Sequence, residues 1–317
     1  MPIKIPNDLP ARQELEEEGL CVVSESVAVR QDIRPLRIAL LNLMPQKERT
    51  ETQMARLIGS GPLQVELTLV TTGSYTPTNV SQKHMRDFYR PWESVSQEKF
   101  DGFIITGAPV EQMPFEDVFY WKELTDILDW TQTHVHQTLG LCWGAQAALY
   151  HFHGVPKHQL DAKLFGVFQH RVVTQNSAML RGFNDSFPVP VSRHTEVRHE
   201  DLPEEAGLRV LAESDEAGLC LIEDPALNHI YMFNHLEYDA NTLRDEYLRD
   251  RKLGLEIALP KYYFPGDDPD REPPNFWRSH AHLMIANWIN DIYQTTSFDI
   301  SKIGEVPRSP SAARQRA

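Results

Sequence analysis

Residues 136–151, HQTLGLCWGAQAALYH, carry the clearest structural signal in the chain. Residues 136–142 form a short run that suits a buried strand, and the small residues of 144–151 suit a packed helix. Cys142 therefore stands where a strand turns sharply into a helix, with a glycine two positions away on either side. Such a turn brings the two backbones together, so the flanking positions must lack bulky side chains. The pattern predicts a Cys142 side chain raised above a sheet.

Short apolar runs and helical periods alternate along most of the chain. Before this stretch the sequence predicts strands at 36–43, 64–71 and 101–106, with helices at 47–58 and 119–132. After it the sequence predicts strands at 166–173, 219–222 and 229–233, and a last helix at 277–293. Strands that alternate with helices form a parallel sheet with helices on both faces. The predicted fold class is therefore α/β, with a mostly parallel sheet.

The length of 317 residues allows one large domain or two small ones. Residues 1–35 are polar and acidic, and they predict an N-terminal arm with one short helix near 11–18. Residues 298–317 end in SPSAARQRA and predict a disordered tail. No internal repeat is visible, so residues 36–297 are expected to form a single domain between these two extensions.

The composition argues against several kinds of protein. With 31 Lys and Arg against 45 Asp and Glu, the formal net charge is −14, which argues against a nucleic-acid binder. Three cysteines without a CxxC pair do not make a disulfide framework or a structural zinc site. The N-terminus lacks the pattern of a signal peptide, and no apolar run is long enough to span a bilayer. We expect a cytoplasmic protein without a metal site or a membrane segment.

Cys142 is the strongest candidate for a catalytic nucleophile. Its predicted place at a helix N-terminus favours the thiolate, and the backbone amide of Trp143 can serve as a donor to an oxyanion. A second amide is expected from the loop at 107–109, where Ala108 is the better donor because proline has no N–H. The alternatives are that Cys142 is a small buried hydrophobic residue and that the loop is an ordinary turn.

A base for this nucleophile is predicted in FNHLE at 233–237, directly after a strand. A thiol needs a base to accept its proton, and the base needs a partner that orients it. His235 and Glu237 stand two positions apart, so they project to one side if the strand continues through them. Functional loops gather at the C-terminal ends of parallel strands, where Cys142 is also predicted. The alternative is a solvated histidine and glutamate in a loop.

These motifs, taken in order, resemble the class I glutamine amidotransferase-like fold, a flavodoxin-like sheet that carries a Cys-His-Glu triad. The chain is more closely similar to the homoserine O-acyltransferase family of the homoserine O-succinyltransferase type. The resemblance rests on stretches throughout the chain: NLMPQKERTETQ at 42–53, ITGAPVEQMPFEDVFYW at 105–121, LCWGAQAAL at 141–149, KLFGVFQH at 163–170, RGFNDSFPVPVSRH at 181–194, HLEYDANTLRDEYLRD at 235–250, YYFPGDDP at 262–269 and WRSHAHLMIANW at 277–288. His-Leu-Glu stands where many relatives have His-Pro-Glu, a departure that keeps both catalytic residue types.

The resemblance implies an acyl transfer from acyl-CoA to the hydroxyl group of L-homoserine, an entry step to methionine synthesis. Cys142 would form an acyl-thioester, His235 would take the proton of the homoserine hydroxyl, and Glu237 would hold the imidazolium. Residues 36–297 would then be the acyltransferase domain. We expect no bound cofactor, with acyl-CoA as the co-substrate, and relatives suggest a homodimer. Two alternatives stay open: a glutamine amidotransferase with the same triad, and a non-catalytic binding protein on the same scaffold.

By position in the family's motifs, Lys163, Ser192 and Arg249 would bind the amino-acid substrate. The planar guanidinium of Arg249 suits a carboxylate, and Ser192 can bind a small polar group. Without the resemblance, Lys163 and Arg249 would be interpreted as surface ion pairs and Ser192 as a turn residue. Lys47 and Arg49 are possible phosphate contacts for coenzyme A, or equally surface charges.

The acyl group is predicted from Glu111, which lies two residues past Pro109. In the family, succinyl-CoA users resemble one another in carrying glycine at this position, and acetyl-CoA users carry glutamate. A succinyl group ends in a carboxylate, and a second carboxylate within roughly 4 Å costs about 1 to 4 kcal/mol. The glutamate side chain also fills space that glycine leaves open. We therefore expect acetyl-CoA as the donor; the alternative is that Glu111 points to solvent and decides nothing, with succinyl-CoA as the other possible donor.

Overall fold

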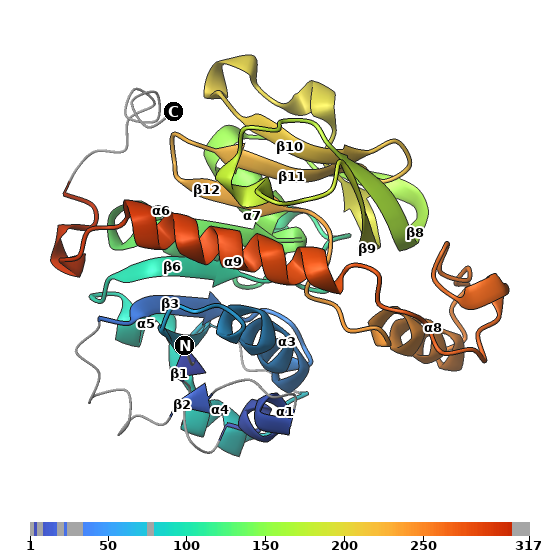
Figure 1. Cartoon of the computed structure of the whole chain (residues 1–317), viewed down its shortest axis with the longest axis horizontal. Helices are drawn as coiled ribbons and strands as arrows, with labels where there is room; N and C mark the ends of the chain where they lie inside the picture. The colour runs from blue at the N-terminus through green and yellow to red at the C-terminus, as the bar shows by residue number, and fades with distance from the viewer. Residues whose placement is uncertain (1–2, 5–8, 18–21, 24–33, 75–78, 306–317) are drawn as a thin grey trace.

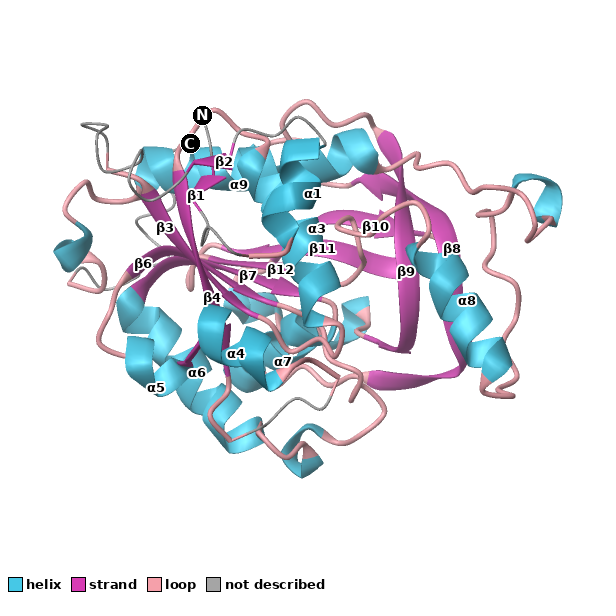
Figure 2. Ribbon diagram, turned by 90° about the horizontal axis from the view of Figure 1, so that it is seen from below, coloured by secondary structure: helices cyan, strands magenta, loops and turns pink. Residues whose placement is uncertain are grey.

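The computed structural model describes residues 3–4, 9–17, 22–23, 34–74 and 79–305 (Figure 1). These residues form one sheet of twelve strands, with helices packed on both of its faces (Figure 2). The strand order is β2-β1-β4-β3-β6-β7-β12-β11-β10-β8-β9, and β5 pairs with β4. The arrangement confirms the predicted α/β class with a mostly parallel sheet.

The parallel part of the sheet is built largely from the first half of the chain. Its strands, in spatial order, are β2 (Val22–Val23), β1 (Ile3–Lys4), β4 (Val65–Thr71), β3 (Leu36–Leu41), β6 (Phe100–Ile105), β7 (Val135–Leu141) and β12 (His229–Met232), with β5 (Tyr89–Pro91) beside β4. The strands predicted at 36–43, 64–71, 101–106, 136–142 and 229–233 are confirmed as β3, β4, β6, β7 and β12. Parallel neighbours place their carboxyl ends at one edge, so the loops that follow β3, β6, β7 and β12 meet there.

An antiparallel part continues the sheet beyond β12 and is absent from the predicted architecture. It consists of β11 (Gly218–Asp224), β10 (Arg209–Ser214), β8 (His158–Val172) and β9 (Ser186–Glu196). Between these strands the chain forms only short 3₁₀ turns, and strands without a crossover helix pair antiparallel. The predicted strand at 166–173 overlaps the second half of β8, and that at 219–222 falls within β11.

β9 escapes prediction because Pro188 and Pro190 interrupt its apolar pattern. Proline cannot donate a backbone hydrogen bond and is tolerated mainly in edge strands. β9 is the last strand on its side of the sheet, which explains how it accommodates both residues.

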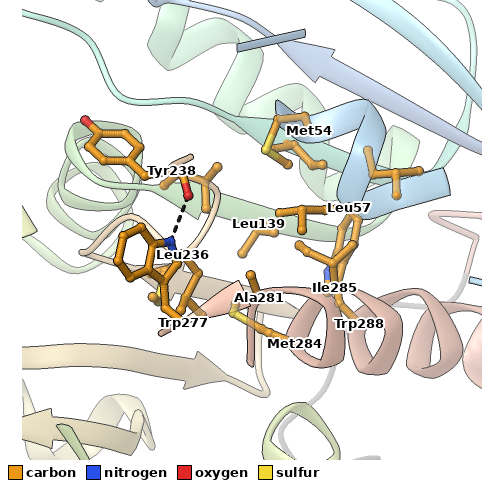
Figure 3. Packing of buried hydrophobic residues seen from close by; sticks show 14 of the residues in the cluster. Met54, Leu57, Leu139, Leu236, Tyr238, Trp277, Ala281, Met284, Ile285 and Trp288 are labelled. Carbon is orange, nitrogen blue, oxygen red and sulfur yellow. Dashed lines mark hydrogen bonds between the residues drawn. The ribbon is translucent and has the colours of Figure 1, made fainter. Parts of the chain in front are cut away.

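Helices divide between the two faces of the sheet. They are α1 (Ala11–Glu17), α3 (Lys47–Gly59) and α9 (Arg278–Thr295) on one face, α5 (Trp92–Val95), α6 (Trp121–His134) and α7 (Trp143–His153) on the other, and α4 (Gln82–Phe88) and α8 (Thr242–Lys252) near the edges. Alternate residues of β3 separate the two cores: Ile38 packs with the α3 side and Ala39 with the α6 side. Figure 3 shows Met54 and Leu57 of α3 in the same buried cluster as Ile285 and Trp288 of α9. The three longest helices confirm those predicted at 47–58, 119–132 and 277–293, whereas α4, α5 and α8 are additional.

Both ends of the described chain pack on the sheet. The helix expected near residues 11–18 is α1, and Leu15 is buried in the same core as α3. The tail predicted to be disordered from residue 298 is ordered as far as residue 305, because Ile303 is buried and Lys99 Nζ donates to the Ser301 carbonyl at 2.6 Å. The rest of that predicted tail, 306–317, lies outside the described residues.

Candidate active site

Cys142 occupies the turn between β7 and α7, at the carboxyl edge of the sheet. Its backbone φ is 49°, a left-handed conformation that residues other than glycine rarely adopt. A Cβ added at Gly140 would lie 2.8 Å from Cα of Ala145, and one added at Gly144 would lie 2.6 Å from the Thr106 carbonyl oxygen. Both glycines are therefore required by contacts with backbone atoms, as the sequence predicts for this turn.

A cavity of about 440 Å³ opens beside Cys142, and we call it the site cavity. Its walls come from the loops after β3, β6, β7 and β12, from β8 and β9, and from α8. Seven of the residues predicted for the site line it: Ala108, Glu111, Cys142, Lys163, Ser192, His235 and Arg249. The fold thus brings to one place residues that are widely separated in the sequence.

The candidate base and its partner lie in a turn. β12 ends at Met232, and the Tyr238 backbone N–H donates to the His235 carbonyl at 3.3 Å. The strand does not continue through these residues, but the turn brings His235 Nδ1 within 2.6 Å of Glu237 Oε1, so the pair forms. The Tyr238 ring stacks on the imidazole with centroids 4.2 Å apart and fixes its orientation. His235 is buried, which is at odds with the alternative of a solvated loop.

The charges around His235 favour its protonated form. Burial by itself lowers the pKa of an imidazole, but attraction to Cys142 and Glu237 outweighs it and raises the pKa of His235 well above its usual range. A side-chain hydrogen bond between Cys142 and His235 acts in the same direction. A histidine in contact with a cysteine and oriented by a carboxylate is the arrangement that a thiol nucleophile requires.

The backbone of loop 107–109 lies against the cysteine. A Cβ added at Gly107 would lie 3.2 Å from Cys142 Cβ and 3.7 Å from its Sγ. Ala108 follows and lines the site cavity. Trp143 is the first residue of α7, where backbone N–H groups have no partner within the helix. The two amides predicted for an oxyanion site therefore belong to segments that flank Cys142.

Lys163 and Ser192 meet at one carboxylate, that of Glu246 on α8. Ser192 Oγ donates to Glu246 Oε2 at 2.6 Å, and Lys163 Nζ lies 3.3 Å from the same oxygen. Tyr238 Oη donates to Glu246 Oε1 at 3.0 Å. Lys163 is largely buried and Ser192 lies within β9, so the alternatives of a surface ion pair and a turn residue do not hold.

Arg249 and Asp250 continue this polar wall along α8. Arg249 Nε donates to Asp250 Oδ1 at 2.7 Å, and Lys163 Nζ lies 3.4 Å from Asp250 Oδ2. The Arg249 side chain is 54% exposed, which places its guanidinium at the rim of the site cavity. The sequence analysis does not single out Glu246 or Asp250, although positions 246, 249 and 250 share one face of a helix.

Glu111 lines the site cavity and its carboxylate is held in place. Its Oε2 accepts hydrogen bonds from the His194 backbone N–H at 2.9 Å and from Thr195 Oγ1 at 3.3 Å. Lys157 Nζ donates to the Glu111 carbonyl at 2.5 Å and fixes the main chain of the same loop. These contacts are inconsistent with the alternative that Glu111 points to solvent.

Lys47 and Arg49 are not exposed phosphate contacts. Lys47 is buried, its Nζ donates to the Asn42 carbonyl, and burial lowers the pKa of its ammonium to about 8. Arg49 pairs with Asp245 at 3.0 Å and donates to Thr242 Oγ1 at 3.0 Å. Both side chains serve the fold around α3.

Two further findings concern the described residues as a whole. They contain no group of three or more His, Cys, Asp or Glu side chains arranged to hold a metal ion. Among the helices that the structure describes, none combines the length and apolar character needed to cross a membrane.

Proteins of known sequence resemble this chain over nearly its whole length. A family model described as homoserine O-succinyltransferase matches residues 2–298. A homoserine O-acetyltransferase of Hyphomonas neptunium is 61% identical over 305 residues, covering 96% of this chain and all of that protein. A homoserine O-acetyltransferase of Brucella canis is 58% identical over 306 residues, with the same coverage. The chain belongs to the homoserine O-succinyltransferase family.

Solved structures place this family member on the fold that the sequence predicts. A glutamine amidotransferase from Thermotoga maritima matches with a TM-score of 0.52 at 12% identity, covering 83% of this chain and 100% of that one. A glutamine amidotransferase from Methylobacillus flagellatus matches with a TM-score of 0.50 at 13% identity, covering 82% and 95%. At such identities the likeness concerns the fold alone, and it confirms the class I glutamine amidotransferase-like architecture.

Proposed function

We propose that this homoserine O-acyltransferase takes its acyl group from acetyl-CoA and forms O-acetyl-L-homoserine and free CoA for methionine biosynthesis. The observation that carries the proposal is Glu111, whose carboxylate is fixed in the same cavity as Cys142. The names of the relatives at 61% and 58% identity support the same acyl group.

The first half-reaction uses Cys142 as the nucleophile. Its thiolate sulfur attacks the thioester carbonyl carbon of acetyl-CoA, and the amides of Ala108 and Trp143 donate to the oxyanion that forms. The bond between the carbonyl carbon and the CoA sulfur then breaks. The departing CoA thiolate takes a proton from the His235 imidazolium, which leaves neutral His235 and an acetyl-thioester on Cys142.

The second half-reaction returns the protein to its starting state. Neutral His235 accepts the proton of the homoserine hydroxyl, and the hydroxyl oxygen attacks the acetyl carbonyl carbon. The carbon–sulfur bond breaks, so Cys142 leaves as a thiolate beside a protonated His235. Glu237, 2.6 Å from Nδ1, stabilises that imidazolium in both halves.

The polar wall of the site cavity suits the amino-acid acceptor. Arg249 and Lys163 provide positive charge for the homoserine carboxylate, and Ser192 provides a hydroxyl. Glu246 contacts Lys163 and Ser192 and offers a carboxylate for the homoserine ammonium group.

The proposal is tested by comparing acyl donors with homoserine as acceptor. The native protein should show a higher kcat/KM with acetyl-CoA than with succinyl-CoA, and Glu111→Gly should shift the ratio towards succinyl-CoA. The shift reflects relief of the repulsion between two carboxylates, about 1 to 4 kcal/mol at roughly 4 Å. A native preference for succinyl-CoA, or an unchanged ratio in the variant, contradicts the assignment of the donor.

Two controls separate the remaining alternatives. A glutaminase assay tests the amidotransferase reaction, for which we expect no activity above background. Mass spectrometry after incubation with acetyl-CoA alone should show an acetyl adduct on Cys142, and its absence would favour a non-catalytic binding protein. We also propose that the protein is a cytoplasmic homodimer. Light scattering on the purified protein measures its mass and so tests whether it is a dimer.

A further inference from the structure

An apolar groove adjoins the site cavity and is lined in part by the loops that follow β3 and β6. We call it the donor groove; it has a volume of about 160 Å³ and is lined by Leu43, Met44, Pro45, Asn79, Pro109, Val110, Met113, Val118, Phe119 and Tyr120. Half of these residues also line the site cavity, namely Met44, Pro45, Pro109, Val110 and Met113. The groove therefore adjoins the site cavity and shares part of its wall.

The two sides of Cys142 differ in chemistry. The wall formed by β8, β9 and α8 carries the charged side chains of Lys163, Glu246 and Arg249. The donor groove, in contrast, contains no charged side chain among its lining residues, and its polar ones are Asn79 and Tyr120. A small zwitterion fits the first side, and an uncharged ligand segment fits the second.

The rim of the donor groove exposes apolar surface to solvent. Phe119 is 76% exposed and Met113 is 41% exposed. Exposed aromatic and aliphatic side chains beside a cavity are typical of ligand-binding grooves, because the ligand covers the apolar surface when it binds.

A thioester donor must place its carbonyl carbon at Cys142 while the rest of the molecule leads away. The acyl group itself lies in the site cavity, where Glu111 is held; Glu111 does not line the donor groove. The arm that joins the thioester sulfur to the nucleotide of an acyl-CoA is long, thin and uncharged. We propose that the donor groove binds this pantetheine arm of the acyl-CoA, an inference that rests on the proposed function.

One loop then contacts three parts of the donor. In residues 107–113, the Ala108 amide faces the carbonyl oxygen, Glu111 limits the acyl group, and Val110 and Met113 contact the arm. Lys157 fixes this loop by donating to the carbonyls of Glu111 and Met113, each at 2.5 Å. The arm and homoserine thus occupy different walls, so Val110 and Met113 are expected to act on binding of the donor.

The test compares donors that carry different lengths of the arm. Phe119→Ala removes the exposed ring at the rim, and Met113→Trp fills the groove with a larger side chain. Each variant is assayed with acetyl-CoA, with acetyl-pantetheine and with S-acetyl-N-acetylcysteamine, which lacks most of the arm. Phe276→Ala is the matched control, since Phe276 is 63% exposed and lies outside both the cavity and the groove.

We expect both variants to lower kcat/KM for acetyl-CoA and acetyl-pantetheine by about tenfold, Phe119→Ala by loss of an aromatic contact and Met113→Trp by blocking the groove. The kcat/KM for S-acetyl-N-acetylcysteamine and that for homoserine should stay within about twofold of native, because each constant of a double-displacement reaction reports its own half-reaction. Phe276→Ala should match the native protein throughout.

Other outcomes overturn the inference. Equal losses with all three donors would show that the groove does not recognise the arm. Losses that follow acyl length, tested with propionyl-CoA and butyryl-CoA, would assign the groove to the acyl chain. If Met113→Trp does not fold, Phe119→Ala at the exposed rim decides the question. A native protein that acetylates homoserine from no donor would overturn the proposed function, whereas native activity with unchanged variants overturns only the groove.

Discussion

At Cys142, backbone strain and charge act on the same side chain. The left-handed φ of 49° turns the cysteine out of the sheet, a conformation that costs of order 1–3 kcal/mol and is maintained by the surrounding packing. His235 lies against the buried Cys142 side chain, and Glu237 Oε1 lies 2.6 Å from Nδ1 of the imidazole. The strained backbone positions the sulfur, and the charges around His235 raise the pKa of its imidazole.

Glu237→Gln tests the charge on His235. A raised pKa keeps the imidazolium protonated to higher pH, so the donor half-reaction should fall only as pH rises through that raised pKa. Replacing the carboxylate by an amide removes a cause of the shift, and the alkaline fall should move to lower pH by about one unit or more. The measurement is kcat/KM for acetyl-CoA against pH, and an unchanged alkaline limb would contradict the assigned role of Glu237.

Thr195→Val tests how Glu111 is held. The Thr195 hydroxyl donates to Glu111 Oε2 at 3.3 Å and also lies 3.1 Å from Gln146 Oε1, so valine removes a contact to the carboxylate at nearly constant volume. We expect the preference for acetyl-CoA over succinyl-CoA to weaken by about threefold to tenfold, the equivalent of one hydrogen bond. Thr195→Ser keeps the hydroxyl and should restore the native ratio; equal ratios in the valine and serine variants would disprove the positioning role.

At the scale of elements, the strand–turn–helix unit of β7 and α7 depends on the close approach of β6. Gly144, in the first turn of α7, faces the carbonyl oxygens of Ile105 and Thr106 at the end of β6. These are backbone atoms, which cannot move aside as a flexible side chain can. The turn between β7 and α7 is therefore packed against a third element, β6, and this packing requires a glycine at position 144.

Gly144→Ala should destabilise the protein. The added Cβ would lie 2.6 Å from the Thr106 oxygen, and overpacking of this kind costs about 1–3 kcal/mol. Gly61→Ala is the control, since a Cβ there meets nothing within 4 Å and should change stability by less than about 0.5 kcal/mol. Urea unfolding measures the stability of both variants, and equal midpoints would show that the turn between β7 and α7 accommodates the added methyl group.

At the scale of the whole molecule, segments outside the sheet complete its cores. Leu9 and Leu15, from the predicted N-terminal arm, are buried in the same core as α3 and α9. Ile303, from the predicted tail, is buried at the other end of the chain. An arm or tail with a polar composition can still hold a few apolar residues that pack.

Leu15→Ala should therefore behave as a core substitution. Leu15 is 0% exposed, and a buried leucine replaced by alanine loses about 2–5 kcal/mol. Leu253→Ala serves for comparison, because Leu253 is 68% exposed and its truncation should be nearly neutral. Thermal unfolding of the two variants gives the difference, and a neutral Leu15→Ala would mean that the arm folds independently of the sheet.

Local pattern was enough to predict the parallel strands, the three long helices and the glycine-flanked cysteine. Apolar periods and turn residues act over a few positions, so they can be interpreted without knowing what the segment packs against. The antiparallel strands are harder to predict from local pattern. Pro188 and Pro190 argue against a strand at β9 unless its place at the sheet edge is known.

Only the tertiary structure decided which residues, distant in the sequence, meet at the site. The hydrogen bond of Ser192 to Glu246 spans 54 positions, and that of the His194 amide to Glu111 spans 83. No local period links residues so far apart, since their meeting depends on how strands order themselves in the sheet and where α8 docks. The sequence by itself predicts the nucleophile chemistry proposed for Cys142, His235 and Glu237, whereas long-range packing determined which carboxylates and amides surround these residues.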